Sequence, residues 1–163
     1  MDWWIFDLEA DGLLDTATTV WCGVFRNIAS GEVRKFDPSD PYYLHHMLKF
    51  MDECEGLIGH NVFGYDFPLL RMLYGYDYNG GKIDTLVWSK MLQPHRQVPW
   101  GCPVKNRPHS VEAWGYRVGR GKPDHEDWSQ FSKEMLHRNS EDTAIQALIY
   151  TALLEEMESH DWQ

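Results

Sequence analysis

The chain has 163 residues, of which 43% are hydrophobic and 14% are aromatic. This composition excludes a disordered chain, because disordered sequences lack the side chains that build a core, and we expect a single domain over residues 1–163. No apolar run reaches the ~20 residues of a membrane span, and the first residues lack the basic start and long apolar stretch of a signal peptide. The sequence therefore predicts a cytoplasmic protein with no membrane partner.

The chain is acidic, with 25 Asp and Glu against 15 Lys and Arg and a net charge of −10. Such a balance disfavours binding of nucleic acid through many Lys and Arg contacts to phosphate. It does not exclude a site in which carboxylates hold divalent cations, since the bound metal reverses the local charge. The cysteines Cys22, Cys54 and Cys102 fit neither a disulfide framework nor a zinc pattern, so we expect buried thiols.

The first half of the chain predicts strands and then alternating elements. Apolar and β-branched runs predict strands at 3–6, 19–25 and 33–36, with a hairpin turn at 28–32. Helical spacing follows over 41–53, then a short strand at 56–61 and a helix over 66–73 with Asp66 near its N-cap.

The second half is mostly helix and loop. Residues 82–87 predict a short strand entering a helix, and four prolines make 93–108 a loop. Helical patterns return at 110–118 and at 144–157, the last capped by Asn139 or Ser140. The order of elements predicts a mixed α/β sandwich with helices flanking the sheet.

Four carboxylates and one histidine form the candidate site. Asp7 and Glu9 are two residues apart at the end of the first predicted strand, so on an extended backbone they project from one face. Asp66 lies at a strand-to-helix junction, and Asp142 lies in the first turn of the last helix with His137 on the incoming segment. The structural alternatives are a solvated strand end, helix capping, a helix-dipole interaction and a surface histidine.

These residue types suit a phosphodiester hydrolase. Hard divalent cations prefer oxygen ligands, and carboxylates from separate elements can hold two ions against a phosphate. One ion would activate water and the other would stabilise the leaving oxygen, while a nearby histidine would take the proton.

Three segments stand in the order and spacing of known motifs: Phe6–Glu9, His60–Asp66, and His137 followed by Asp142. In this the sequence resembles the DnaQ-like DEDD exonucleases of the histidine subtype. Further runs, among them the segment 112–117 (Glu-Ala-Trp-Gly-Tyr-Arg), resemble the proofreading domain of podovirus-type family A DNA polymerases over nearly the whole chain.

The resemblance implies a ribonuclease-H-like fold with about five strands flanked by helices, and 3′-to-5′ hydrolysis with two Mg²⁺ or Mn²⁺ ions. Asp7 would bridge both metals, Glu9 and Asp142 would complete one, and Asp66 would help the second through water. His137 would be the general base. It also implies substrate-binding positions at Leu8, Ala10, Leu13, Asn61 and Phe63.

Two departures from the polymerase domains stand out. They carry a tyrosine four residues before the last aspartate, where this chain has Arg138. No polymerase domain follows Gln163, so we expect a stand-alone exonuclease encoded by a phage.

The expected substrate is nucleic acid with a free 3′ end, with single-stranded DNA favoured. The segment from Trp100 to Lys122 combines basic and aromatic residues, which suits phosphate contacts and base stacking. Its basic residues are Lys105, Arg107, Arg117, Arg120 and Lys122, and its aromatic residues include Trp100, Trp114 and Tyr116. Trp114 is better explained as a core residue. The alternatives are an exoribonuclease acting on RNA or short oligoribonucleotides, and a non-catalytic accessory subunit that binds nucleic acid. Replication proteins are the expected protein partners.

Overall fold

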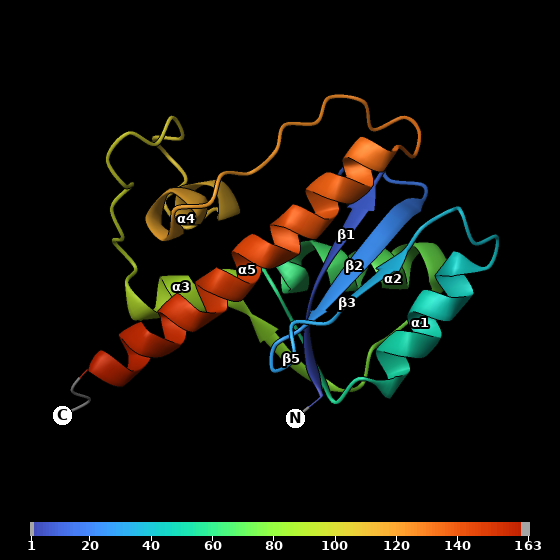
Figure 1. Cartoon of the computed structure of the whole chain (residues 1–163), viewed down its shortest axis with the longest axis horizontal. Helices are drawn as coiled ribbons and strands as arrows, with labels where there is room; N and C mark the ends of the chain where they lie inside the picture. The colour runs from blue at the N-terminus through green and yellow to red at the C-terminus, as the bar shows by residue number, and fades with distance from the viewer. Residues whose placement is uncertain (1, 161–163) are drawn as a thin grey trace.

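The computed structural model describes residues 2–160. Five strands form one sheet in the order β3-β2-β1-β4-β5 (Figure 1). Their bounds are β1 Trp3–Ala10, β2 Val20–Asn27, β3 Val33–Phe36, β4 Gly56–Gly59 and β5 Gly81–Asp84. The central strand β1 pairs antiparallel with β2 and parallel with β4, and β5 extends the parallel part. The expected mixed sheet of about five strands is confirmed.

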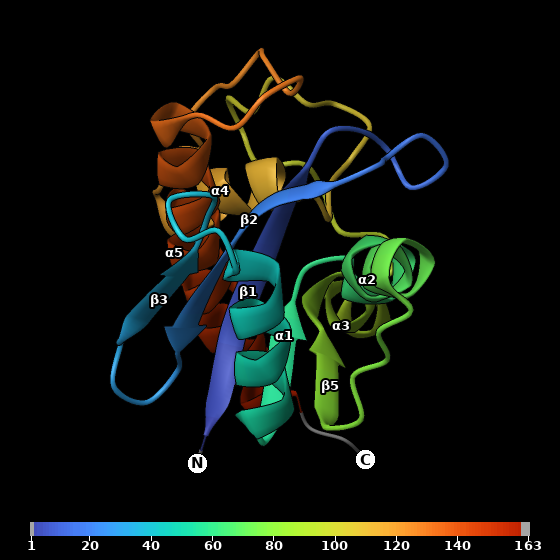
Figure 2. The same cartoon turned by 90° about the vertical axis from the view of Figure 1, so that its right-hand side faces the viewer.

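Helices cover both faces of this sheet. In Figure 2, α1 (Tyr43–Glu53) lies in front of the strands and α5 (Lys133–Ser159) lies behind them. The short helix α2 (Phe67–Tyr74) packs into the same core as α1, whereas α3 (Thr85–Leu92) and α4 (Val111–Val118) contact α5. The longest helix therefore crosses the face of β1 and β2 that α1 leaves free.

The alternation of β1 sorts its side chains between these two faces. Trp4, Phe6 and Leu8 are buried in the core with α1 and α2, and the Phe6 ring stacks on Phe25 with centroids 5.6 Å apart. Because neighbouring residues of a strand point to opposite faces, Asp7 and Glu9 face α5. The hydrophobic anchoring of one face thus fixes the carboxylates on the other.

Helix α5 begins earlier than its apolar pattern predicts. The hydroxyl of Ser132, not Asn139 or Ser140, caps it by accepting a hydrogen bond from the amide of Met135 at 3.1 Å. The face turned to the sheet carries Asn139, Asp142 and other polar residues in the first half of the helix, so no apolar stripe marks that half.

The junction after β4 also differs from the prediction. A short π-helix, η1 (Val62–Asp66), precedes α2, and Asp66 makes no side-chain capping bond to α2. Asp84 shapes this junction, because its carboxylate accepts hydrogen bonds from the amides of Asn61 (2.9 Å) and Phe63 (3.1 Å). Asn61 adopts a left-handed conformation, with φ of 64°.

Cys22, Cys54 and Cys102 are free and buried, as predicted. Among the described residues, no helix combines the length and apolar character that crossing a membrane requires.

Candidate active site

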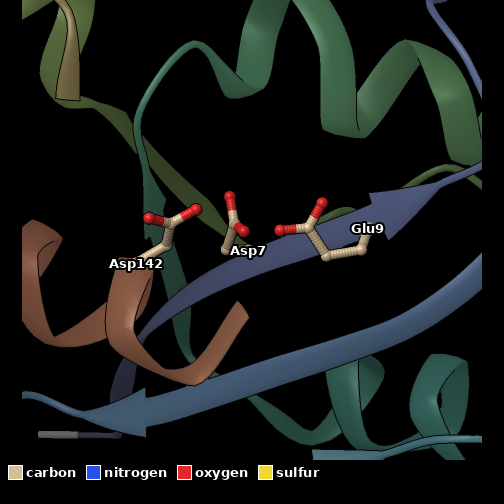
Figure 3. Close-up of side chains that lie close together, drawn as sticks. All are labelled: Asp7, Glu9 and Asp142. Carbon is tan, nitrogen blue, oxygen red and sulfur yellow. The ribbon is translucent and has the colours of Figure 1, made fainter. Parts of the chain in front are cut away.

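Three carboxylates converge where β1 meets α5. Asp7, Glu9 and Asp142 each offer one oxygen, and these oxygens all lie within 4.8 Å of one another. Figure 3 shows Asp7 between the other two side chains. Glu9 and Asp142 are only 8% and 3% exposed, so water screens their charges poorly. The structure thus brings together three of the four predicted carboxylates.

Asp66 stands close to this cluster but in a different setting. It is 4% exposed, it lines the same cavity, and its Oδ1 accepts a hydrogen bond from the amide of Leu8 at 3.2 Å. Burial, and then the charge of Asp7, raise its pKa well above the ordinary value. Asp66 therefore belongs to the same electrostatic unit as the three converging carboxylates.

The cluster is short of positive charge. Burial and the neighbouring Asp142 raise the pKa of Asp7 to about 7, and burial and Asp7 raise the pKa of Glu9. Burial also raises the pKa of Asp142, against the opposing effect of Lys122. Such shifts mean that ionised carboxylates here lack compensating charge, which a bound cation would provide.

The donor set fits a hard divalent cation. The Oδ1 atom of Asp142 is buried and has no hydrogen-bond partner among residues 2–160. A buried acceptor without a partner is costly, and a cation ligated there would remove that cost. Asp7, Glu9 and Asp142 would hold such an ion directly, and Asp66 would hold one nearby.

Two amides of α5 hold Asp7 in place. The Nδ2 of Asn139 donates to the carbonyl oxygen of Asp7 at 2.9 Å and to its Oδ2 at 2.8 Å. The Nε2 of Gln146 donates to Oδ1 at 3.3 Å, and its Oε1 accepts from the amide of His60 at 3.2 Å. The sequence interpretation missed both residues, although their spacing from Asp142, three before and four after, places all three on one helix face.

Two cations flank the carboxylates. The Nζ of Lys122 lies 3.2 Å from Oδ2 of Asp142, in the segment between α4 and α5. Arg138 lines the cavity, and its guanidinium lies 4.7 Å from the ring of Trp128. The charge of Arg138 opposes the rise in the pKa of Glu9 and Asp142. The position at which polymerase domains carry tyrosine therefore does face the site.

His137 does not join the site, which corrects the general-base prediction. It is exposed and lines a separate hollow with Lys35 and Asp37. The reason is the early start of α5: within a continuous helix, five residues turn the side chain about 140° away from Asp142. The prediction placed His137 on a segment before the helix, from which it could fold back.

The predicted substrate positions separate into two groups. Leu8 and Asn61 line the cavity, although the side chain of Leu8 packs in the core, as does that of Ala10. Leu13 and Phe63 are 75% and 49% exposed and lie outside the cavity lining. Leu13 and Phe63 therefore form exposed apolar surface outside the cavity, and the side chain of Ala10 packs only in the core.

A cavity of about 1250 Å³ extends from the carboxylates toward α4 and the loop before it. Its lining includes the predicted Tyr116, which is half-exposed. The basic side chains around it are Lys90, Arg107, Arg120, Lys122 and Arg138. An acidic chain thus presents a local basic rim at this opening.

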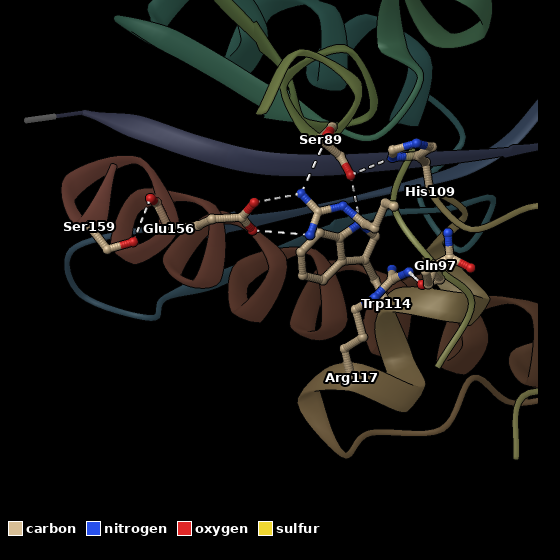
Figure 4. A network of polar contacts seen from close by, with 8 residues as sticks. Ser89, Gln97, His109, Trp114, Arg117, Glu156 and Ser159 are labelled. Carbon is tan, nitrogen blue, oxygen red and sulfur yellow. Dashed lines mark hydrogen bonds and ion pairs between the residues drawn. The ribbon is translucent and has the colours of Figure 1, made fainter. Parts of the chain in front are cut away.

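Other members of the predicted basic and aromatic segment hold the fold together. Trp114 is buried between Arg96 and Arg117, whose guanidinium carbons each lie 4.7 Å from its ring. Arg96 forms an ion pair with Glu156 of α5 at 2.9 Å, and Trp114 donates to Ser89 (Figure 4). These contacts fix α4 against α5. Lys105 and the fully exposed Trp100 are outside the cavity lining.

Curated relatives match the sequence. The DNA-directed DNA polymerases of Enterobacteria phage T3 and Escherichia phage T7 are each 26% identical over 92% of this chain. The chain spans only 26% of the length of either polymerase. No protein-family model matches the sequence.

Solved structures match the fold. NrnC of Brucella melitensis with bound Mg²⁺ has a TM-score of 0.66 at 16% identity, covering 97% of this chain and 74% of that chain. Exonuclease I of E. coli in complex with a dT13 oligonucleotide has a TM-score of 0.59 at 13% identity, covering 93% and 40%. The chain thus has the ribonuclease-H-like fold of these two structures, and its resemblance to phage DNA polymerases is confirmed.

Proposed function

We propose that the chain is a metal-dependent 3′-to-5′ exonuclease that removes nucleotides from single-stranded DNA. The observation that carries this proposal is the convergence of Asp7, Glu9 and Asp142 within 4.8 Å, with a buried Asp142 oxygen that lacks a partner. Mutually repelling buried acids are costly, so a site that binds no cation has no use for them.

When bound, two Mg²⁺ or Mn²⁺ ions supply the Lewis acidity that activates water and stabilises the leaving oxygen. Asp7, which lies between Glu9 and Asp142 (Figure 3), would help to hold both ions, as the family resemblance implies. Glu9 and Asp142 would help to hold one ion, and Asp66 would help to hold the other. Asn139 and Gln146 orient Asp7 through its two carboxylate oxygens.

The reaction adds the elements of water across one phosphodiester bond. The oxygen of water bonds to phosphorus, the bond from phosphorus to the 3′ oxygen breaks, and that oxygen leaves with a proton. A nucleoside 5′-monophosphate is released. Because a stacked terminal nucleotide cannot reach buried carboxylates, the terminal residue has to leave its stack, which favours single-stranded ends.

The comparisons support the substrate class. The related phage proteins are DNA polymerases, and the exonuclease I structure contains a dT13 oligonucleotide. The proposed setting is DNA replication, proofreading or DNA degradation by a phage, in the host cytoplasm and beside replication proteins. The 3′-to-5′ polarity rests on the family resemblance.

A second candidate is hydrolysis of RNA or short oligoribonucleotides. The observation that favours it is the NrnC structure bound to pGG, which has a TM-score of 0.67 to this chain at 16% identity. The two candidates use the same carboxylates and differ in the contacts made to the sugar.

The test is incubation of the purified protein with 5′-labelled and 3′-labelled single-stranded DNA and RNA of one sequence, in Mg²⁺, Mn²⁺ or EDTA. The proposal predicts a metal-dependent ladder that shortens from the 3′ end, faster on DNA, and absent in Asp7→Ala. Faster shortening of RNA would support the second candidate. Metal binding without cleavage of either polymer would contradict both and support an accessory binding role.

A further inference from the structure

Lys122 makes a direct contact with the carboxylate cluster from outside its two supporting elements. It lies in the segment between α4 and α5, its side chain is 25% exposed, and its Nζ is 3.2 Å from Oδ2 of Asp142. It also lines the cavity in which the proposed substrate would lie. The following inference rests on the proposed exonuclease function.

Lys122 has hydrogen-bond donors that Asp142 does not use. An ammonium group has three N–H donors, and among the described residues only Asp142 accepts from Lys122. The other oxygen of Asp142, Oδ1, is also without a partner there. Asp142 can therefore ligate a cation through Oδ1 while Oδ2 retains Lys122.

The segment that carries Lys122 is anchored on both sides. Before Lys122, Arg120 forms an ion pair with Glu141 at 2.7 Å. After it, the backbone carbonyl of Trp128 accepts a hydrogen bond from Nε1 of Trp21 at 2.9 Å, and Arg138 lies over the Trp128 ring. These contacts hold the segment that carries Lys122 against α5 and β2, and so fix Lys122 beside the carboxylates.

The charge balance of the site indicates which group the remaining N–H donors of Lys122 bind. Ionised Asp7, Glu9, Asp66 and Asp142 would be neutralised by two divalent cations, which leaves the charge of a phosphodiester unmatched. As water attacks phosphorus, further negative charge develops on the non-bridging oxygens. A preorganised cation beside them stabilises that charge in the transition state.

We propose that Lys122 is a catalytic residue that donates hydrogen bonds to a non-bridging oxygen of the scissile phosphate while it remains bound to Oδ2 of Asp142. It acts as a third, protein-borne cation beside the two metals. The tests must distinguish this role from a simpler one, in which Lys122 neutralises Asp142 only until metal binds and makes no contact with substrate. We call this simpler role a placeholder.

The kinetic test compares Lys122→Met with Lys49→Met. Both substitutions replace a lysine with methionine, but Lys49 is an exposed residue of α1, on the face of the sheet opposite the carboxylates. With saturating Mn²⁺ and single-stranded DNA, Lys122→Met should lower kcat about 100-fold, the effect typical of losing one donor to transition-state charge. Lys122→Arg should recover part of this loss, and Lys49→Met should lower kcat far less.

A binding test gives a readout that needs no turnover. Calorimetry with Ca²⁺ and thymidine 5′-monophosphate measures affinity for the product, which carries the former scissile phosphate. Lys122→Met should weaken that affinity about tenfold, because a hydrogen bond to a charged group is lost. A placeholder would instead give unchanged nucleotide affinity, tighter Mn²⁺ binding and normal kcat in Lys122→Met, and this result would overturn the proposal.

The two proposals fail in different ways. If the wild type shows no metal-dependent hydrolysis, the proposed function fails, whereas the nucleotide titration still reports on Lys122. If the wild type is active and Lys122→Met matches it, only the role of Lys122 fails. Should circular dichroism show that Lys122→Met is unfolded, Lys122→Gln, which lacks the charge, provides the same comparison.

Discussion

Asn139 and Asp7 are joined by two hydrogen bonds, one to the backbone carbonyl and one to the carboxylate of Asp7. One side chain of α5 thereby sets both the position of the helix on β1 and the orientation of the central carboxylate. Asn139 is fully buried. The packing of this helix and the geometry of the site are thus a single structural feature.

The first prediction concerns this contact. Asn139→Ala should lower the free energy of unfolding by about 1 to 3 kcal/mol, because it leaves buried acceptors of Asp7 without a donor. It should also lower kcat, since the freed carboxylate no longer has a fixed orientation. Urea denaturation and steady-state kinetics measure the two effects. The neighbouring Ser140→Ala serves as the control, and equal effects of the two variants would contradict the assigned role.

The second prediction concerns pH. Burial and Asp142 raise the pKa of Asp7 to about 7, so the folded state binds a proton that the unfolded state has already lost above pH 4. Stability therefore falls as pH rises from about 4 to about 7, by an amount on the order of a few kcal/mol for the metal-free protein. Asp7→Asn should remove part of this fall.

The measurement is denaturation in EDTA at several pH values, for wild type and Asp7→Asn. Burial lowers the pKa of His60 to about 4, so the contribution of His60 to stability rises with pH over the same range. This contribution is the same in both proteins and cancels when they are compared. At pH 7.5, Mn²⁺ should stabilise the wild type by binding the folded state and should stabilise Asp7→Asn less. A difference between the two proteins that does not change with pH would contradict the electrostatic account.

The third prediction concerns the histidine that the family motif selects. His137→Ala should leave kcat and its pH profile unchanged, because His137 is exposed and lines a hollow apart from the carboxylates. Arg138→Ala should lower kcat, because Arg138 lines the active-site cavity. Loss of the acid limb of the pH profile in His137→Ala would show that His137 reaches the site during turnover.

The fourth prediction concerns Asp84, which organises the junction that carries Asp66. Asp84→Ala removes acceptors for the amides of Asn61, Phe63 and Leu86 and should cost about 2 to 4 kcal/mol of folding free energy. It should also raise the Mn²⁺ concentration needed for activity. Asp77→Ala, which removes an exposed partner of Arg71, is the matched control. Equal thermal stability of both variants would contradict this role.

The strands and the carboxylates of β1 could be predicted because their signal is local. Apolar residues alternate with Asp7 and Glu9, so one strand both anchors in the core and presents its acids to the opposite face. The order of the remaining elements then limits the fold to a mixed sheet covered by helices. The family resemblance added the expected 3′-to-5′ polarity, which residue types and spacing alone do not contain.

The start of α5 could not be predicted, and the histidine interpretation failed with it. The sheet-facing side of this half-helix is polar because Asn139 and Asp142 serve the site, so the apolar period that marks a helix is missing there. Lys122 was noticed only as a basic residue of a loop. Its contact with Asp142 spans twenty residues and depends on how the segment before α5 folds back, which no local pattern encodes.

The proposed exonuclease activity is tested most directly by Mn²⁺-dependent release of nucleotides from 3′-labelled single-stranded DNA, compared between wild type, Asp7→Ala and the exposed control Asp15→Ala. We expect release of labelled mononucleotide by the wild type and Asp15→Ala, its abolition by EDTA, and a loss of at least about 1000-fold in Asp7→Ala, because this substitution removes the central carboxylate of the proposed metal site. Release of mononucleotide by Asp7→Ala at the wild-type rate would contradict the proposed site.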